Sequence, residues 1–237
     1  MKKVLVFDIW SEYGHFKKPY TTTSPLTFSI PSRTALTGII GAILGIEKGM
    51  NNTELNYSKC NMSVRILSPI KKVIINQNLI KTKTAKLMSR MKSVGGRTQI
   101  RFEKLKNPRY RIYVEIFQEK LHNKLKTSLI EHLAQYTPCM GLTEDIINFN
   151  FIGEFDYREK NGEVLIDSVV SLEGLDTGKL EFESEKEYFV DNYPLEMTQD
   201  REVLKYGEII VERKGKSIKI YDENYIDIDN GEKILWI

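Results

Sequence analysis

The sequence has few of the residues that build disulfide frameworks and metal sites, with two cysteines and three histidines in 237 residues. Cys60 and Cys139 lie far apart in the chain and belong to no CxxC or Cys/His motif. Because zinc sites and small disulfide-rich folds need closely spaced ligands, this pattern indicates neither of them. We expect two buried free thiols.

Long apolar runs are also absent. The longest candidate, residues 39–46, is far shorter than the ~20 residues needed to span a bilayer, and the segment MKKVLVFDIW at the start lacks the features of a signal peptide. The composition, 41% apolar and 28% charged, is that of an ordinary globular protein. We therefore predict a cytoplasmic protein without a membrane partner.

Four short motifs with known chemistry are missing as well: GxxxxGK[ST], GxGxxG after a strand, HExxH and GxSxG. Without them the chain lacks the minimal parts for P-loop nucleotide hydrolysis, dinucleotide binding, zincin chemistry and α/β-hydrolase chemistry. We predict no cofactor and no metal.

Acidic residues are almost absent from residues 81–111, which contain eleven Lys or Arg residues and one acid, Glu103. The net charge of this segment is +10, while that of the whole chain is only +3. Like charges repel, so such a concentration is stable where water or a polyanion reaches it, and phosphate backbones are the commonest such partner. The segment predicts nucleic-acid binding.

The first part of the chain predicts a strand, a loop and a helix. Residues 3–9 form an apolar, β-branched run, residues 10–30 have the composition of an exposed loop, and residues 32–45 repeat apolar side chains with helical spacing. Gly38, Gly41 and Gly45 leave one side of this helix almost without side chains. Either the helix packs closely on a sheet, or another backbone or a phosphate approaches it.

The middle of the chain adds strands at residues 62–79, 109–118 and 148–157 and a helix at residues 119–135. The basic segment joins the first two of these strands and is too long for an ordinary hairpin loop, so we expect it to protrude. The order strand, helix, strand, strand, helix, strand predicts an α+β domain of the ferredoxin-like or RRM-like type over residues 1–160. Residues 161–237 are acidic and predict a small β-rich domain, whose acids form a solvated surface or a docking face for a basic neighbour.

Three histidines are the candidates for acid–base chemistry. His122 and His132 are expected on the surface of the second helix, too far apart to cooperate. His15 stands beside Lys17, Lys18 and Tyr20 in the first loop. Metal-independent RNA cleavage needs a base for the 2′-hydroxyl and a cation for the phosphate, so this group is either catalytic, RNA-contacting or structural.

The basic segment offers groups for phosphate contact and few for base stacking. Gly95 and Gly96 permit a sharp turn or a close approach of backbone, and Met88, Met91 and Val94 offer apolar edges. Aromatic residues are almost absent, with only Phe102 and Tyr110 nearby, and the RNP1 motif is missing, so we expect recognition by charge and shape. The alternatives are a disordered charged insertion and a loop that grips an acidic protein. The candidate phosphate ligands are Lys83, Lys86, Arg90, Lys92, Arg97 and Arg101.

Several short segments together resemble one family. They are Gly14-His15-Phe16, residues 29–34 leading into residues 38–45, residues 136–142, and residues 193–197 with Arg201. The chain is similar over essentially its whole length to the fifth CRISPR-associated protein family of the RAMP superfamily, a subunit of type I Cascade complexes, and in style to its type I-B members.

This resemblance implies a ferredoxin-like domain with a long β-hairpin thumb at residues 81–111 and a small carboxy-terminal β domain. It also implies a subunit that holds the 5′ handle of the CRISPR RNA, caps that end of the complex, and contacts the backbone subunit and the large subunit. Its handle-facing residues would be His15, Lys17, Lys18, Tyr20 and Arg33. Type I-C members cut the repeat RNA with a tyrosine and a Lys-His pair, and this chain has no Lys-His dipeptide. We therefore expect a non-catalytic binder, with a metal-independent endoribonuclease as the alternative.

Overall fold

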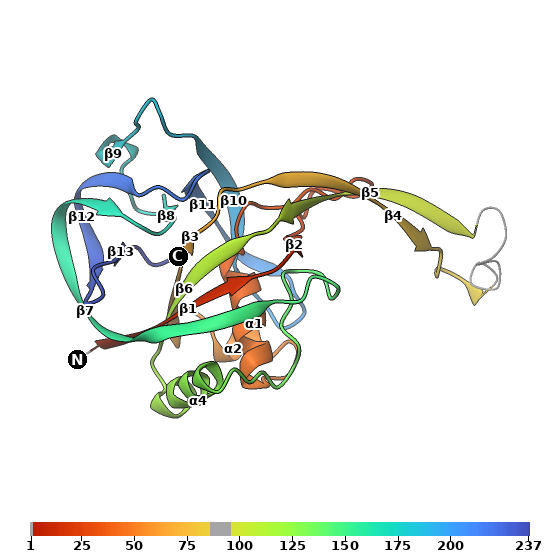
Figure 1. Cartoon of the computed structure of the whole chain (residues 1–237), viewed down its shortest axis with the longest axis horizontal. Helices are drawn as coiled ribbons and strands as arrows, with labels where there is room; N and C mark the ends of the chain where they lie inside the picture. The colour runs from red at the N-terminus through yellow and green to blue at the C-terminus, as the bar shows by residue number, and fades with distance from the viewer. Residues whose placement is uncertain (1, 86–95) are drawn as a thin grey trace.

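The computed structural model describes residues 2–85 and 96–237 and shows an α+β protein built mostly of strands (Figure 1). Its largest sheet is antiparallel and strongly curled. The main strands, in chain order, are β1 (Lys2–Trp10), β3 (Cys60–Ile66), β6 (Arg109–Ile116), β7 (Asn148–Ile166) and β12 (Ile218–Ile228), with the short β9 (Leu180–Glu181) and β13 (Lys233–Ile234) beside β12.

The order of the large sheet is β13-β12-β7-β1-β6-β3. Side chains alternate along β1, so its two faces enter different cores. Leu5, Phe7 and Ile9 pack in the core that contains the helices, whereas Val4 and Val6 pack against side chains of β12 and β13. The 19-residue strand β7 bends far enough to bring β12 and β13 over this second face (Figure 1).

Helix α1 (Arg33–Leu44) begins and ends as predicted. The Ser32 side chain accepts a hydrogen bond from the Ala35 amide, and Gly45 ends the helix with a φ of 73°. Helix α4 (Glu119–Ile130) is shorter than predicted, because the chain leaves the helix and His132 takes a φ of 55°. Leu133, expected on the buried face, is therefore exposed. The short α2 (Asn51–Glu54) lies beside α1.

The predicted strand at residues 62–79 is two strands in two different sheets. β3 belongs to the large sheet, and β4 (Lys72–Ile80) pairs with β5 (Arg97–Lys106) in a hairpin that projects from the body (Figure 1). The short β2 (Tyr13–Gly14) lies on the other side of β5. The prediction of a loop between residues 79 and 109 was therefore wrong over residues 97–106, which form β5, whereas β6 begins at Arg109 as predicted.

The last third of the chain contributes to two sheets. β8 (Val170–Ser171), β10 (Tyr188–Met197) and β11 (Val203–Glu212) form a separate sheet of order β10-β11-β8. The 3₁₀ turn η1 (Thr177–Lys179) lies between β8 and β10 in the chain. β7 runs across the predicted domain boundary at residue 160, and the division into two domains stays a prediction. No helix within residues 2–85 and 96–237 is long and apolar enough to cross a membrane.

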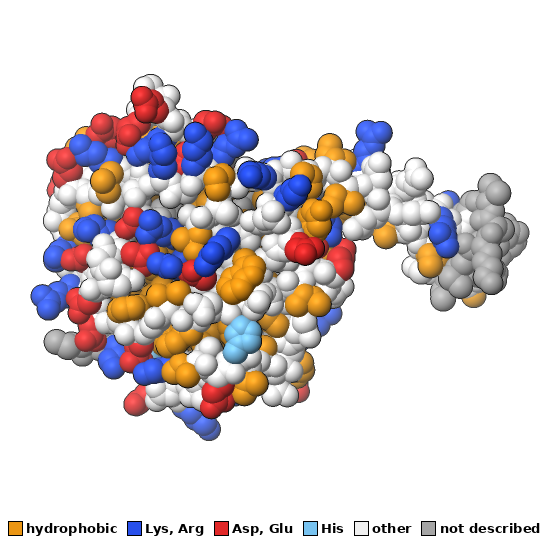
Figure 2. All heavy atoms as spheres, viewed as in Figure 1, with side chains coloured by type: hydrophobic (Ala, Val, Ile, Leu, Met, Phe, Trp, Pro, Cys, Tyr) orange, Lys and Arg blue, Asp and Glu red, His pale blue; other side chains and the backbone are white. Residues whose placement is uncertain are grey.

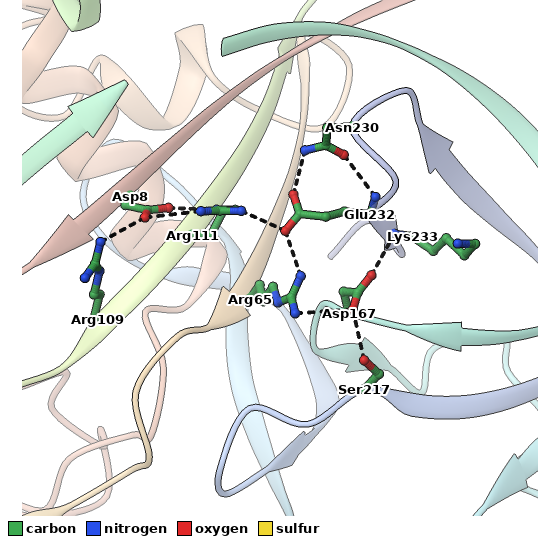
Figure 3. A network of polar contacts seen from close by, with 9 residues as sticks. All are labelled: Asp8, Arg65, Arg109, Arg111, Asp167, Ser217, Asn230, Glu232 and Lys233. Atoms are coloured by element: carbon green, nitrogen blue, oxygen red, sulfur yellow. Dashed lines mark hydrogen bonds and ion pairs between the residues drawn. The ribbon is translucent and has the colours of Figure 1, made fainter. Parts of the chain in front are cut away.

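A network of charged side chains connects Asp167 and Glu232 to the strands β1, β3 and β6 of the large sheet (Figure 3). Arg111 on β6 donates to Asp8 on β1 at 2.8 Å and to Glu232 at 2.9 Å. Glu232 also accepts from Arg65 on β3 at 2.7 Å, and Arg65 reaches Asp167 at the end of β7 at 3.4 Å. The hydrogen bond to Asp8, partly opposed by burial, raises the pKa of Arg111. These contacts connect strands that are far apart in the sequence.

Candidate nucleic-acid interface

A groove of about 1050 Å³ lies at the root of the β4–β5 hairpin. Its floor is one side of α1, and its walls come from the loop after β2, the hairpin, residues 136–142 and the start of the β10–β11 turn. The residues of α1 that line it are Thr34, Ala35, Gly38, Ile39, Gly41 and Ala42, together with the cap Ser32.

The glycines of α1 have different surroundings. A Cβ on Gly38 would meet no atom within 4 Å, so this position is open to the groove. A Cβ on Gly41 would lie 2.9 Å from Cβ of Asn51, and one on Gly45 would collide with Gln135. Of the two alternatives, close packing on a sheet does not describe these glycines, because Gly41 lies against Asn51 of α2, Gly45 lies against Gln135 after α4, and Gly38 leaves space.

The hairpin turns only one of its faces to the groove. Ile100 and Phe102 on β5 line the groove. Because successive side chains of a strand point to opposite faces, Arg97 and Arg101 lie on the other face of the hairpin, where they are exposed and pair in register with Ile80 and Asn76. Arg97 and Arg101 are thus separated from the groove by the thickness of the sheet.

His15 is in the interior, 2% exposed. Its Nδ1 lies 2.7 Å from the carbonyl oxygen of Glu103 on β5 and donates to it, since a carbonyl only accepts. Burial lowers the pKa of His15 despite this hydrogen bond. Its backbone amide also donates to the carbonyl of Met140 at 2.8 Å. The residue joins the first loop to the root of the hairpin and to residues 136–142.

The other predicted residues of the first loop separate into exposed and paired ones. Lys17 is exposed and lines the groove. Lys18 is largely buried and pairs with Asp191 on β10 at 2.5 Å. Burial opposes the charge of Lys18, but hydrogen bonds with Asp191 and Tyr20 outweigh it and raise its pKa. Tyr20 is exposed.

Arg33 is almost fully buried. Its guanidinium lies 3.8 Å from the ring centre of Tyr57 and donates to the carbonyl of Cys60 at 2.9 Å. Burial raises the pKa of Tyr57 to about 12, so the ring stays neutral beside the cation. Arg33 is enclosed by the fold, whereas His15 lines the groove although it is only 2% exposed, and an RNA-binding role for either one stays a prediction.

Several cations of the basic segment are neutralised by acids from distant parts of the chain. Lys104 on β5 pairs with Asp145 at 2.8 Å, and both side chains are only 4% exposed. At the start of β6, Arg109 and Arg111 both pair with Asp8. These three residues account for part of the charge of the segment but hold the fold together.

The outer part of the hairpin keeps its charge. No Asp or Glu occurs between residues 71 and 102, and Figure 2 shows charges of both signs mixed over the body but no acid on the visible outer hairpin. Lys83, Arg97 and Arg101 are exposed, and no acidic partner contacts them among the described residues. The predicted ligands Lys86, Arg90 and Lys92 lie outside the described residues.

Two cations of the groove were missed by the sequence analysis as ligands. Lys48 and Arg201 are exposed and line the groove together with Lys17 and a single acid, Glu47. Nothing in the sequence separates them from other surface cations, since they follow α1 and β10 in the chain and meet only in the fold. The groove therefore combines apolar side chains with three cations and suits an extended anionic chain.

The remaining histidines and cysteines occupy unrelated places. His132 is exposed and stacks on Phe149, whereas His122 is buried with its Nε2 2.8 Å from Glu154, so the expectation of a surface position for His122 was wrong. Both cysteines are free thiols and Cys60 is buried, as predicted, but Cys139 is partly exposed, so the expectation of a buried position was wrong for Cys139. Within the part of the chain that the structure describes, no group of three or more His, Cys, Asp or Glu could hold a metal ion.

Comparison with known proteins gives one family. The profile of the family described as "CRISPR-associated protein (Cas_Cas5)" matches residues 4–123, and no curated protein sequence matches the chain. A CRISPR protein from Archaeoglobus fulgidus has a similar fold, with a TM-score of 0.59 and 12% identity over 98% of both chains. A chain of a CRISPR RNA-guided surveillance complex also has a similar fold, with a TM-score of 0.56 and 12% identity over 91% of both chains. A chain of a Type III-B Cmr-beta complex bound to target RNA has a TM-score of 0.51 and 13% identity over 92% of this chain and 86% of that chain.

Proposed function

Since the chain belongs to the Cas5 family of CRISPR-associated proteins, we propose that it is an RNA-binding subunit of a Cascade-type antiviral complex. In this proposal it holds the 5′ handle of the CRISPR RNA and caps that end of the complex, next to the backbone subunit and the large subunit. Support for a place in a larger assembly comes from the similar folds found in a surveillance complex and in a Cmr-beta complex.

The observation that carries the proposal is the groove at the root of a basic hairpin. The groove offers Lys17, Lys48 and Arg201 for phosphates, and Phe102 and Ile100 as apolar surface for bases. The hairpin adds exposed cations on its opposite face, so an RNA strand that passes from the groove around the hairpin meets positive charge along its path. Single-stranded nucleic acid is bound by such combinations of cationic grooves and apolar platforms.

We also propose that four strands form a ferredoxin-like unit. The sheet order β7-β1-β6-β3 is antiparallel throughout, with α1 between β1 and β3 in the chain and α4 between β6 and β7. This is the arrangement expected when two βαβ units are interleaved. The β4–β5 hairpin is then an insertion between the second and third strands of the unit.

The proposed role is that of a non-catalytic binder. His15, the candidate base, is only 2% exposed, and the Lys-His pair of the cutting branch is missing from the sequence. A general base must reach the proton that it removes, directly or through one water. If the protein cleaves labelled repeat RNA in EDTA and His15→Asn removes that cleavage, the endoribonuclease replaces this proposal.

The binding test compares two variants of one position. Gly38→Gln fills the groove from its floor, whereas Gly38→Ala adds a methyl group in open space. We expect the glutamine variant to bind labelled repeat RNA about tenfold more weakly than the wild type, a loss of ~1.4 kcal/mol, and the alanine variant to bind like the wild type. Equal binding by all three, measured by fluorescence anisotropy, contradicts the groove as the RNA site.

A further inference from the structure

The outer edge of the hairpin has no partner strand. β4 is the last strand of the sheet β2-β5-β4, and no other described strand pairs along its outer side. An edge of this kind presents a row of free backbone donors and acceptors to solvent. By contrast, the outer edge of β3 is covered by the chain itself, because the amides of Val169 and Ile237 donate to the carbonyls of Val64 and Met62.

This edge also lacks the features by which soluble proteins protect exposed strands. Residues 73–80 (VIINQNLI) contain no charged residue, no proline and no glycine. Ile74 is 71% exposed, Ile80 42% and Leu79 38%. Edge strands are normally protected by lysines, prolines, bulges or a covering segment, and a long apolar edge without them is a site of pairing with another chain.

The strand is complementary to itself. If two antiparallel copies of β4 pair about Gln77, every residue faces the one at the mirrored position: Ile74 faces Ile80, Ile75 faces Leu79, and Asn76 faces Asn78. Apolar side chains then meet apolar ones and amides meet amides on both faces of the pair, which is how cross-strand pairs stabilise a sheet. A two-fold axis at Gln77 requires this register, since an isologous contact uses the same patch on both copies.

We propose that β4 is the pairing edge for β4 of a second copy of this chain, which gives a two-fold dimer joined through the hairpins. The two three-stranded sheets become one continuous sheet. Because the hairpin projects from the body (Figure 1) and the strands run antiparallel, the two bodies lie at opposite ends of the pair. A polyanion does not fit this edge, since no cation occurs between Lys72 and Lys81.

The pairing differs from an association driven by charge. A basic hairpin attracts the acidic carboxy-terminal region of another copy, but salt screens that attraction. Backbone hydrogen bonds and apolar contacts along β4 persist in salt. A dimer that persists at high ionic strength is therefore held by strand pairing and not by the attraction between opposite charges.

The first experiment measures the mass of the RNA-free protein in solution by sedimentation equilibrium over a dilution series at high salt. We expect a monomer–dimer equilibrium for the wild type and a monomer for Ile74→Lys, because the lysine places a charge at the pairing edge. Leu204→Lys is the matched control, since Leu204 is 65% exposed on another strand and is expected to leave the dimer intact. Monomeric wild-type protein, assembly beyond a dimer, or equal loss in the control overturns the proposal.

The second experiment tests the register with one introduced cysteine at a time in a Cys139→Ser background, in which the remaining Cys60 is buried. Directly opposite residues of antiparallel strands have Cα atoms ~4.5–5.5 Å apart, within the ~4.4–6.8 Å that a disulfide spans. Gln77→Cys faces itself across the axis and is expected to form an intermolecular disulfide under mild oxidation. Ile80→Cys faces Ile74 and is expected to remain reduced. Equal cross-linking of both variants contradicts the proposed register.

Discussion

The two ends of the basic hairpin carry similar side chains for different purposes. At the root, Lys104 on β5 is paired with an acid from a distant part of the chain, and so are Arg109 and Arg111 on β6, just beyond the hairpin. In the outer part, Arg97 and Arg101 are exposed and have no acidic partner among the described residues. In a count of charge along the sequence, each residue of either group adds one positive charge.

The difference teaches that the net charge of a segment overstates what is available to a polyanion. A cation that is buried beside a carboxylate stabilises the fold and has no free charge to give to a phosphate. An exposed cation without a partner adds little to stability but can neutralise a phosphate and release counterions. Mutations at the root should therefore change stability, and mutations in the outer part should change RNA binding.

The largest effect is expected at the Lys104–Asp145 pair. Asp145→Ala leaves the buried ammonium of Lys104 without its main partner, and breaking a buried ion pair in this way costs about 3–5 kcal/mol. The measurement is the free energy of unfolding in urea. The double variant Lys104→Met/Asp145→Leu is expected to recover much of the loss, and a single variant as stable as the wild type would contradict a structural role for this pair.

A smaller loss is expected for Asp8→Ala in the network of Figure 3. Asp8 is buried and accepts charged hydrogen bonds from Arg111 and Arg109. Charged hydrogen bonds contribute about 1.5–3 kcal/mol each, and the two arginines retain solvent or Glu232 as alternative partners, so we expect a loss of about 2–3 kcal/mol. Urea unfolding measures this loss of stability. If Asp8→Ala left the stability unchanged and altered RNA affinity by an amount independent of salt, Asp8 would be assigned to RNA binding instead.

A substitution at Gly38, in the groove, is expected to raise the stability, whereas the substitutions at the root lower it. Alanine is favoured over glycine in a helix interior by about 1 kcal/mol, and an added Cβ meets no atom here. Gly38→Ala should therefore raise the midpoint of thermal unfolding. Gly41→Ala is the matched variant, where Asn51 occupies the space, and it is expected to be less stable than Gly38→Ala.

The smallest effect is expected at an ion-pair cluster outside the hairpin. The hydrogen bond from His122, with further ones from Lys126 and Lys3, lowers the pKa of Glu154 to about 2 from an ordinary 4.5. A carboxylate with a lowered pKa in the folded state stabilises the fold above its ordinary pKa, and this contribution is lost as pH falls from 4.5 towards 2. Because Lys3 and Lys126 are partly exposed, we expect a contribution of about 1 kcal/mol.

Glu154→Gln should remove that dependence. Its unfolding free energy, measured in urea at several pH values, is expected to fall less steeply than that of the wild type between pH 4.5 and pH 2. Parallel curves for the two proteins would show that this cluster contributes nothing that depends on pH.

Much of the fold could be predicted from local sequence patterns. The apolar run of β1, the periodicity and caps of α1, and the strands β6 and β7 all depend on signals within a few residues. β5 was missed because its many charges suggested a loop, although Ile100 and Phe102 alternate with Arg101 and Glu103 as in a strand. Helix α4 is shorter than predicted because the backbone takes a positive φ at His132, and no sequence pattern predicted this conformation.

The candidate site was less predictable because it depends on contacts between distant residues. The partners of the root cations, Asp8, Asp145 and Glu232, lie in three separate parts of the sequence. The same holds for Lys48 and Arg201, which join the groove only through the fold. Conversely, Arg33 stands beside the loop in sequence but points into the interior.

The most direct test of the difference between root and outer hairpin is the salt dependence of RNA binding by Arg97→Ala/Arg101→Ala, with Arg97→Lys/Arg101→Lys as the control that keeps the charge. Each lost contact with a phosphate of single-stranded RNA lowers the slope of log K against log salt by about 0.7. We predict a slope about 1.4 shallower for the alanine variant, no change of slope for the lysine variant, and wild-type stability for both. An alanine variant with the wild-type slope would contradict the assignment of the outer hairpin to RNA binding.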